Sequence, residues 1–207
     1  MYPLKFIFDR IVALLGLLAL SWLFLIIAIL VKVNLPEGPV IFKQIRVGKD
    51  GRLFKIHKFR TMVDEAEISN IAYPNRARIT PFGARLRRHK LDELPELWDV
   101  LIGKMSFVGP RPDVPGYADQ LQGDDRVILK MRPGITGPAT LKYRNEEQLI
   151  ENYVKKAKAD GDVRSEEEIA RWYNDEVIYP DKVRINVAYY NNYSFFNDLL
   201  IILKTII

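Results

Sequence analysis

The sequence contains no cysteine and only two histidines among its 207 residues. The absence of cysteine excludes disulfide bridges, thiolate nucleophiles and cysteine-based zinc sites, and it fits a protein that faces a reducing cytoplasm. Two histidines also argue against a histidine-rich metal site. The length of 207 residues is enough for one compact domain plus a membrane element, or for two small domains, and the hydrophobic content of 48% provides a core.

Charge is missing from one long segment near the N-terminus. The 21 residues at positions 11–31 contain no charged side chain, and Arg10 and Lys32 bracket them. At about 1.5 Å per residue, a helix of this length matches the ~30 Å hydrocarbon core of a bilayer. The run is too long for a cleaved signal peptide, and a buried soluble helix is rarely apolar on every face. We therefore expect residues 1–33 to be membrane-embedded, as a re-entrant helix or a single span.

The charged residues are unevenly distributed. Residues 1–111 carry 18 lysines and arginines against 10 acidic residues, a net of +8, whereas residues 112–207 carry 13 against 16, a net of −3. A basic half beside an apolar segment suggests anionic partners, either phosphate-bearing substrates or an anionic membrane surface. We find no motif for nucleic-acid recognition and expect no nucleic-acid partner.

The most informative stretch, residues 90–112, begins with the adjacent carboxylates Asp92 and Glu93. An apolar row follows at the spacing of one helix face: Leu94, Leu97, Trp98, Leu101 and Ile102. Pro95 falls in the predicted first turn, and Gly103 supplies a stop. The pattern predicts a packed helix with the two carboxylates at its N-terminus, where free backbone N–H groups favour a carboxylate or a substrate phosphate.

On its own the acidic pair has an ordinary interpretation, a capping aspartate followed by a first-turn glutamate. The preceding residues are unusually basic. A strand is predicted to begin at residues 40–42, a hairpin turn follows at residues 49–52, and a second strand covers residues 53–60. This second strand has cations on both faces, with Lys58 and Arg60 on one of them. They either guard a solvated edge strand or form a cationic wall for phosphate.

Three further arginines stand out. Arg87 belongs to a basic run at residues 85–90, which either keeps the carboxylates ionised and attracts a polyphosphate, or forms a solvated helix face or a membrane contact. Arg111 lies between two prolines that limit where its guanidinium can point, which suits a bidentate phosphate contact. Arg132 lies in a second rigid loop, residues 131–138. The ordinary alternative for both loops is a rigid turn with a solvated arginine.

The last third of the chain is predicted to be helical. Residues 145–178 form two amphipathic helices around a polar turn, and a break is expected at Tyr179 and Pro180. Another helix is predicted at residues 183–193. Residues 195–207 are strongly apolar but too short to span a bilayer, so we expect partial contact with the membrane interface.

Together these stretches resemble the bacterial sugar transferases, also called monotopic phosphoglycosyl transferases, from residue 6 to residue 205. The carriers are the apolar segment after FDR at residues 8–10, GPVIFKQ at 38–44, FKIHKFRTM at 54–62, LDEL at 91–94, MSFVGPRP at 105–112 and RPGITG at 132–137. Each is modest alone, but in this order they are specific. Relatives often have Ser-Pro within the membrane helix where this chain has Ser21 and Trp22, so a bend has to come from Ser21, Gly16 and the surrounding packing.

The resemblance implies a reaction. A sugar 1-phosphate moves from a UDP-sugar to a polyprenyl phosphate, usually undecaprenyl phosphate, with release of UMP, a requirement for Mg²⁺ and a covalent phosphosugar–aspartate intermediate. It implies that Asp92 is the nucleophile and Glu93 its metal-binding or proton-handling partner, with both carboxylates as Mg²⁺ ligands. It further implies that Lys58, Arg87 and Arg111 bind phosphate and that the Arg132 loop lies near the nucleotide, and we add Arg60 to the substrate-binding set.

The expected architecture is a mainly helical α+β fold. Residues 1–33 form a re-entrant membrane helix, and residues 34–207 form a small catalytic domain with a β-hairpin and amphipathic interfacial helices, on the cytoplasmic face of a bacterial inner membrane. The expected role is the first membrane step of cell-surface glycoconjugate synthesis, and a homodimer stays open. Two alternatives are a membrane-bound UDP-sugar hydrolase without a lipid acceptor, and a non-enzymatic membrane-anchored protein that binds anionic lipid or nucleic acid.

Overall fold

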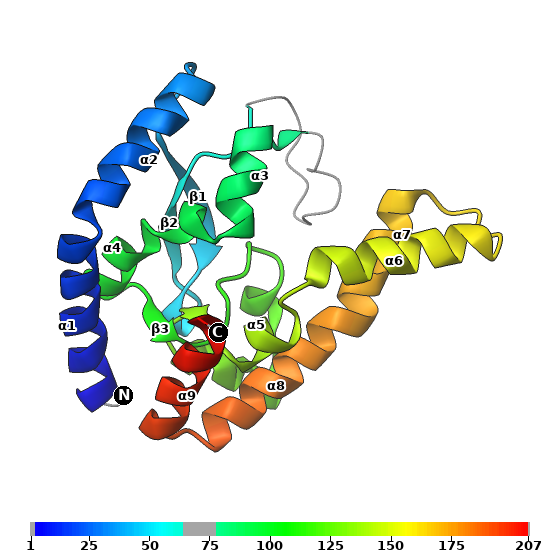
Figure 1. The fold of residues 1–207 in the computed structure, drawn as a ribbon. Helices are drawn as coiled ribbons and strands as arrows, with labels where there is room; N and C mark the ends of the chain where they lie inside the picture. Colours follow the sequence, from blue (N-terminus) through cyan, green and yellow to red (C-terminus); the bar gives the residue numbers. More distant parts are fainter. Residues whose placement is uncertain (1–2, 64–77, 207) are drawn as a thin grey trace.

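The computed structural model describes residues 3–63 and 78–206. The helices are α1 (Pro3–Ala19), α2 (Ser21–Asn34), α3 (Pro81–Arg88), α4 (Glu96–Leu101), α5 (Pro138–Lys142), α6 (Glu146–Ala159), α7 (Glu166–Tyr173), α8 (Tyr179–Asn191) and α9 (Phe195–Ile206). The strands are β1 (Ile41–Val47), β2 (Leu53–Phe59), β3 (Ser106–Val108) and β4 (Gly134–Thr136). The described chain is thus mostly helical with two small two-stranded sheets, as the predicted fold class requires (Figure 1).

The charge-free N-terminal segment forms two helices rather than one. α1 ends at Ala19 and α2 begins at Ser21, and the two helices are bent by 63° at this break. The Ser21 hydroxyl donates to the Leu18 carbonyl over 2.9 Å, a local bond that often accompanies helix bending. No single helix in the described ranges is long and apolar enough to cross a membrane, whereas this bent pair passes on length and composition together. The bend therefore forms beside Ser21 without a proline.

Both N-terminal helices expose apolar side chains on their outer side, while Ala13 and Val31 are buried on the inner side. The exposed set comprises Leu4, Ile7, Ile11, Leu14, Leu15, Leu18, Trp22, Leu25, Ile26, Ile29, Leu30 and Val33. The two helices line one side of the molecule, drawn in blue in Figure 1. So many exposed apolar side chains in one place indicate a contact surface for lipid or protein.

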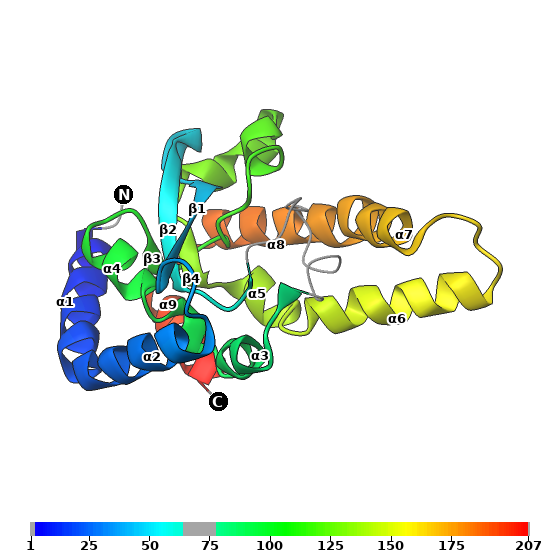
Figure 2. The same ribbon diagram turned by 90° about the horizontal axis from the view of Figure 1, so that it is seen from above.

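β1 and β2 form the predicted antiparallel hairpin, which the short turn η1 (Lys49–Gly51) closes. Asp50 and Gly51 both have positive φ, as a tight hairpin turn demands. Ile56 of β2 packs into the same buried cluster as Ala13 of α1 and Val100 of α4. The hairpin thereby brings β2 against α4, the helix that follows the two predicted catalytic carboxylates (Figures 1 and 2).

β3 and β4 pair in parallel and hold two loops side by side. The Gly134 N–H donates to the Pro110 carbonyl over 2.8 Å, and the Gly109 N–H donates to the Thr136 carbonyl over 2.9 Å. A Cβ atom at Gly134 would lie 2.1 Å from the Gly109 nitrogen, so this approach of the two backbones requires glycine. The junction fixes the backbone of the loop that carries Arg111.

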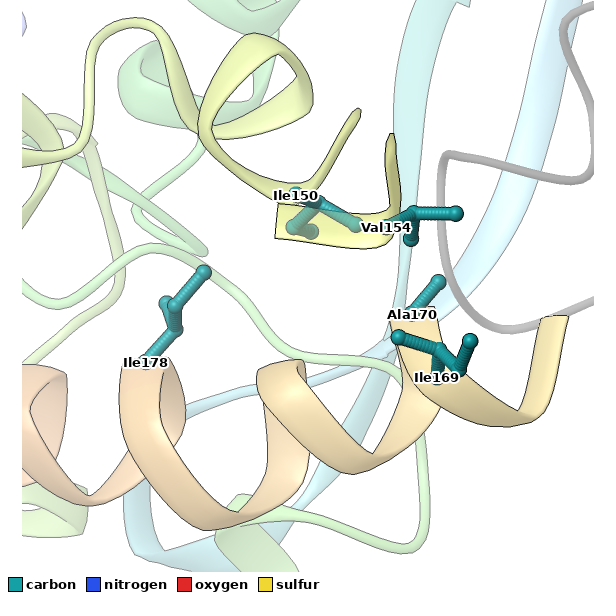
Figure 3. Close-up of a cluster of buried hydrophobic side chains, with 5 residues drawn as sticks. All are labelled: Ile150, Val154, Ile169, Ala170 and Ile178. Carbon is teal, nitrogen blue, oxygen red and sulfur yellow. The ribbon is translucent and has the colours of Figure 1, made fainter. Parts of the chain in front are cut away.

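α6 and α7 form the predicted pair of amphipathic helices and extend away from the rest of the molecule (Figures 1 and 2). A buried apolar cluster joins them to the following turn η6 (Asn174–Ile178): Ile150, Val154, Ile169, Ala170 and Ile178. Figure 3 shows these side chains pointing toward one another between the helices. The N-terminal end of α6 is thereby held in place by its packing on α7 and η6.

The predicted break at Tyr179 and Pro180 is wrong. The chain remains helical from α7 through the π-helical turn η6 into α8. Pro180 comes directly after the π-helical turn, in which the Tyr179 N–H donates to the Asn174 carbonyl, five residues back, and the helix continues through it.

α9 covers the apolar C-terminal segment as a helix. Its inner side meets α1, where Phe195 contacts Phe8 edge-to-face at 5.3 Å between ring centroids and Asp198 pairs with Lys5. Its outer side exposes Phe196, Leu200 and Leu203, which follow helical spacing. This exposed stripe fits the expected membrane contact, which stays a prediction.

Candidate active site

The chain reverses just before the two predicted catalytic carboxylates. Thr80 caps α3, since its hydroxyl accepts from the Gly83 N–H over 3.0 Å, as the sequence predicts. Lys90 then adopts a left-handed conformation with a φ of 55°. The short 3-10 turn η3 (Leu91–Glu93) follows and places Asp92 and Glu93 in buried positions.

The predicted helix is displaced from its expected place. Both carboxylates lie in η3, and α4 begins only at Glu96. The buried side of α4 carries the acids Glu96 and Asp99, whereas Trp98 and Ile102 of the predicted packed row are 50% and 43% exposed. α4 lies between α1 and β2: Leu94 and Leu101 of the predicted row pack against buried clusters, and the acids find basic partners on β2, so apolar packing and ion pairing both contribute to burial here.

Glu93 is the centre of the charged cluster. Its Oε1 atom lies 2.7 Å from Nζ of Lys58 and 2.7 Å from Nη2 of Arg111, so one carboxylate oxygen receives two cations. Burial alone would raise the pKa of Glu93, but Arg111 and Lys58 outweigh it and hold the pKa well below its ordinary value. Glu93 therefore stays ionised, and three of the predicted site residues meet at this oxygen.

Asp92 differs from its neighbour. Burial and the adjacent charge of Glu93 raise the pKa of Asp92, against the lowering effect of Lys58 and Arg87. Its Oδ1 atom is buried and has no hydrogen-bond partner. Buried polar atoms are nearly always hydrogen-bonded, so an unpartnered carboxylate oxygen indicates a site for a ligand or for chemistry.

Glu96 is a site residue that the sequence analysis missed. Its Oε1 atom lies 3.2 Å from Nζ of Lys58, and burial raises its pKa to about 7 although Lys58 lowers it. Asp99, one turn further along α4, pairs with His57 of β2. The acidic residues at positions 93, 96 and 99 are spaced as one helix face, and this spacing in the sequence indicates that Glu96 lies on the same side as Glu93. The apolar row drew attention to the other side of the same helix.

The remaining predicted arginines lie at three different places. Arg87 of α3 donates to Oε1 of Glu147 in α6 over 2.9 Å and acts electrostatically on Asp92, so it borders the cluster. Arg60 is buried and donates to the Leu35 carbonyl at the end of α2. The third, Arg132, donates from Nε to a backbone carbonyl in the turn after α4 over 2.7 Å and stacks on a ring of α1. The structure thus brings Arg87 to the carboxylates, while a substrate role for Arg60 and Arg132 stays a prediction.

The predicted Mg²⁺ can be tested against the donor atoms. The described residues contain no group of three or more acidic, histidine or cysteine side chains that could hold a metal ion. Mg²⁺ commonly uses only one or two carboxylates and takes its other ligands from water and substrate phosphates. The two adjacent carboxylates of η3, Asp92 and Glu93, fit that mode. Asp92 and Glu93 are therefore suitable Mg²⁺ ligands in company with a substrate.

Comparison with known proteins identifies the class of protein to which the chain belongs. A family model described as bacterial sugar transferase matches residues 1–207, and the chain belongs to this family, as its sequence motifs predict. The glucose-1-phosphate transferase of Escherichia coli (strain K12), named UDP-glucose:undecaprenyl-phosphate glucose-1-phosphate transferase, is 37% identical over 177 residues. That alignment covers 83% of this chain and 38% of the relative.

Two further relatives cover nearly the whole of this chain. The uncharacterized sugar transferase EpsL of Bacillus subtilis (strain 168) is 32% identical over 203 residues, which are 98% of this chain and 85% of that protein. The UDP-N-acetylgalactosamine-undecaprenyl-phosphate N-acetylgalactosaminephosphotransferase of Aeromonas hydrophila is 34% identical over 203 residues, 96% of this chain and 41% of that protein. The chain thus spans well under half of the two relatives with named sugars, and the predicted assignment to the sugar transferases is confirmed.

Proposed function

We propose that this chain transfers a sugar 1-phosphate from a UDP-sugar to undecaprenyl phosphate and releases UMP. The names of relatives from Escherichia coli, Klebsiella pneumoniae and Aeromonas hydrophila support this pair of substrates. These names include both glucose and N-acetylgalactosamine, so the sugar of this chain stays open. Relatives named for exopolysaccharide production favour a role at the first membrane step of a cell-surface glycoconjugate.

The observation that carries the mechanism is the contrast between the two adjacent carboxylates. The Oε1 atom of Glu93 accepts from Lys58 and Arg111, which neutralise its charge and hold it in place. The Oδ1 atom of Asp92 is buried and has no partner. A desolvated carboxylate oxygen without a hydrogen bond is free to attack phosphorus, and carboxylate nucleophiles are known in phosphoryl transfer. Asp92 is therefore the proposed nucleophile and Glu93 the residue that organises the cations.

The proposed reaction has two steps. In the first, Oδ1 of Asp92 bonds to the phosphorus that carries the sugar, the bond from that phosphorus to the bridging oxygen breaks, and UMP leaves with the electron pair. In the second, a phosphate oxygen of undecaprenyl phosphate attacks the same phosphorus. The bond to Asp92 breaks, the carboxylate is restored, and undecaprenyl diphosphate sugar is the product.

The surrounding cations have separate tasks in this scheme. Lys58 and Arg111 lie on the same oxygen of Glu93 and face the charge that builds up on the phosphates during transfer. Arg87 pairs with Glu147, and a substrate phosphate can take the place of that carboxylate. Mg²⁺, when bound by Asp92 and Glu93 together with substrate phosphates, supplies further neutralisation of this charge.

We place the bent pair α1 and α2 in the cytoplasmic leaflet of the bacterial inner membrane, with both ends on the cytoplasmic side. The 63° bend and the exposed apolar side chains on the outer face support this arrangement. The remainder of the chain then lies on the cytoplasmic surface, where the phosphate of undecaprenyl phosphate is within reach.

The test is an assay of UMP release with Mg²⁺, undecaprenyl phosphate and a panel of UDP-sugars. We expect sustained turnover with one sugar only when both Mg²⁺ and lipid are present, and at most about one UMP per chain without lipid, because each site has a single nucleophile. Sustained turnover without lipid would instead favour the UDP-sugar hydrolase. No turnover with any sugar, together with tight binding of anionic lipid or nucleic acid, would favour the non-enzymatic protein.

A further inference from the structure

The ammonium group of Lys58 lies between two carboxylates from successive turns of the chain. Oε1 of Glu93 in η3 is 2.7 Å away, and Oε1 of Glu96 in α4 is 3.2 Å away. A lysine ammonium has three N–H donors on a flexible stem, so a single acceptor leaves its orientation loose. Two acceptors direct two of the donors and leave one for a further ligand. Lys58 also acts electrostatically on Asp92, so this ligand would be bound close to the proposed nucleophile.

The backbone of β2 is held by the same helix. Gly48 N–H donates to the Arg52 carbonyl, and Arg60 N–H donates to the Val40 carbonyl, so even-numbered residues make the ladder bonds to β1. The N–H of the odd-numbered His57 therefore points to the free edge of β2, where it donates to Oδ2 of Asp99 over 2.9 Å. α4 lies along this edge in both views (Figures 1 and 2).

The side chain of His57 adds a second bond to Asp99. Its Nδ1 lies 2.8 Å from Oδ1, so both carboxylate oxygens of Asp99 are occupied by one residue. Glu96 and Asp99, one turn apart on α4, thus hold the neighbouring residues Lys58 and His57 of β2. α4 thus holds the side-chain end of Lys58 through Glu96, and it holds the backbone of the preceding residue, His57, through Asp99.

Glu96 gives Lys58 an acceptor of its own. The carboxylate of Glu93 is shared between Lys58 and Arg111, and a buried carboxylate such as Glu96 is costly unless it is paired. Burial raises the pKa of Glu96 to about 7, and its Oε1 atom faces the Lys58 ammonium group as an acceptor whether or not the carboxyl group is ionised. A glutamine would supply the same acceptor oxygen, and a methionine of similar length would not.

We propose that Glu96 is a positioning residue of the transfer reaction, which orients the Lys58 ammonium group so that its remaining N–H meets a phosphate oxygen of the UDP-sugar. The inference rests on the proposed function. It predicts that Glu96 acts only through Lys58 and on the first step, formation of the phosphosugar–Asp92 bond. It also predicts that the acceptor oxygen of residue 96, not its charge, is what matters.

The test uses the full chain and the UDP-sugar found active in the panel, without lipid acceptor and with the UDP-sugar in excess over enzyme. The number of active sites is taken from the amount of UMP released, and the rate constant from its time course, so loss of folded protein is not mistaken for slow chemistry. We expect Glu96→Met to lower the rate constant about tenfold or more, as misplacement of a charged group does, while Glu96→Gln stays within about threefold of wild type. Glu167→Gln, on the exposed face of α7, serves as the matched control. Equal rates for the Gln and Met variants would overturn the proposal.

A double-mutant cycle separates positioning from a general packing effect. In the Lys58→Met background we expect Glu96→Met to have no further effect on the rate constant of this burst of UMP, which can be followed over hours. If Glu96→Met lowers the rate constant by the same factor in the Lys58→Met background as in the wild type, the proposal is overturned. Glu96→Leu replaces Glu96→Met if the latter does not fold. A wild-type chain that releases no UMP from any UDP-sugar counts against the proposed function instead, so the two failures are distinguishable.

Discussion

The hydroxyl of Ser106 donates to Oδ2 of Asp9 over 2.7 Å, and this bond joins the strand next to the candidate active site to the first apolar helix. Both residues are buried. The same carboxylate accepts from the Phe107 N–H over 3.4 Å, and one turn earlier Lys5 pairs with Asp198 of α9. α1 is thus attached to the catalytic part by polar contacts as well as by apolar packing.

This attachment predicts a loss of stability when Asp9 is removed. Asp9→Ala leaves the buried Ser106 hydroxyl without its acceptor, and an unsatisfied buried group costs about 1–3 kcal/mol. We expect a lower unfolding temperature for Asp9→Ala in detergent, and a smaller further loss when Ser106→Ala is added, because both partners are then gone. Asp9→Asn, which keeps an acceptor oxygen, is the control. Full additivity of the two alanine variants would contradict the interpretation.

The proposed covalent step predicts that Asp92→Asn abolishes turnover. An amide cannot form the acyl phosphate, while its size and burial match those of the aspartate. We expect no sustained UMP release from the purified variant, with membrane association and unfolding temperature close to those of wild type. Wild-type-like activity of this variant would remove Asp92 from the mechanism.

Arg111 is expected to be irreplaceable by lysine. Its guanidinium contacts Oε1 of Glu93 at 2.7 Å from a loop in which it lies between Pro110 and Pro112, and its planar fork offers several donors in fixed directions. A lysine brings one mobile ammonium group and cannot bind Glu93 and a phosphate in the same geometry. We expect Arg111→Lys and Glu93→Gln each to lose at least about 100-fold in kcat/KM for the UDP-sugar, as loss of a transition-state contact does. Full activity of Arg111→Lys would show that the contact is not bidentate.

The raised pKa of Glu96 predicts a pH-dependent stability difference. Burial raises this pKa from about 4.5 to about 7, so between these values the folded chain binds a proton that the unfolded chain releases. The free energy of unfolding contributed by Glu96 therefore falls as the pH rises from about 4.5 to about 7. Glu96→Gln cannot titrate, so its stability relative to wild type should increase over this range, by at most about 3 kcal/mol. Denaturant unfolding at pH 5 and pH 8 measures this, and a constant difference would show that Glu96 keeps an ordinary pKa.

Local patterns in the sequence predicted the parts of this fold that depend on neighbouring residues. The hairpin of β1 and β2 follows from strand composition and the turn at residues 49–52, and the Thr80 cap follows from the type of residue before a proline. Family motifs also singled out Lys58 and Arg111, which the structure brings to Glu93 from segments far apart in the sequence.

Sequence patterns are less informative where packing between distant segments determines which side chains are buried and which partners they contact. The apolar row in the sequence predicted a buried face for α4. Leu94 and Leu101 of this row do pack against buried clusters, but Trp98 and Ile102 are exposed, and the buried acids of α4 pair with Lys58 and His57 of β2. Arg60 shares one side of the predicted strand with Lys58, and its substrate role stays a prediction. It donates to the Leu35 carbonyl, which comes from the chain after α2, and strand alternation does not indicate this contact.

The topology of α1 and α2 gives the last prediction. A re-entrant pair places both flanks on the cytoplasmic side, whereas a single span places them on opposite sides. The chain contains no cysteine, so a single cysteine introduced by Tyr2→Cys or by Pro36→Cys reports its own side without a background. We expect both positions to be shielded from an impermeant thiol reagent in intact cells and labelled after permeabilisation. The bend of 63° supports this outcome, because it directs the two helices away from a common axis. Labelling at position 2 but not at position 36 in intact cells would show that the pair crosses the bilayer.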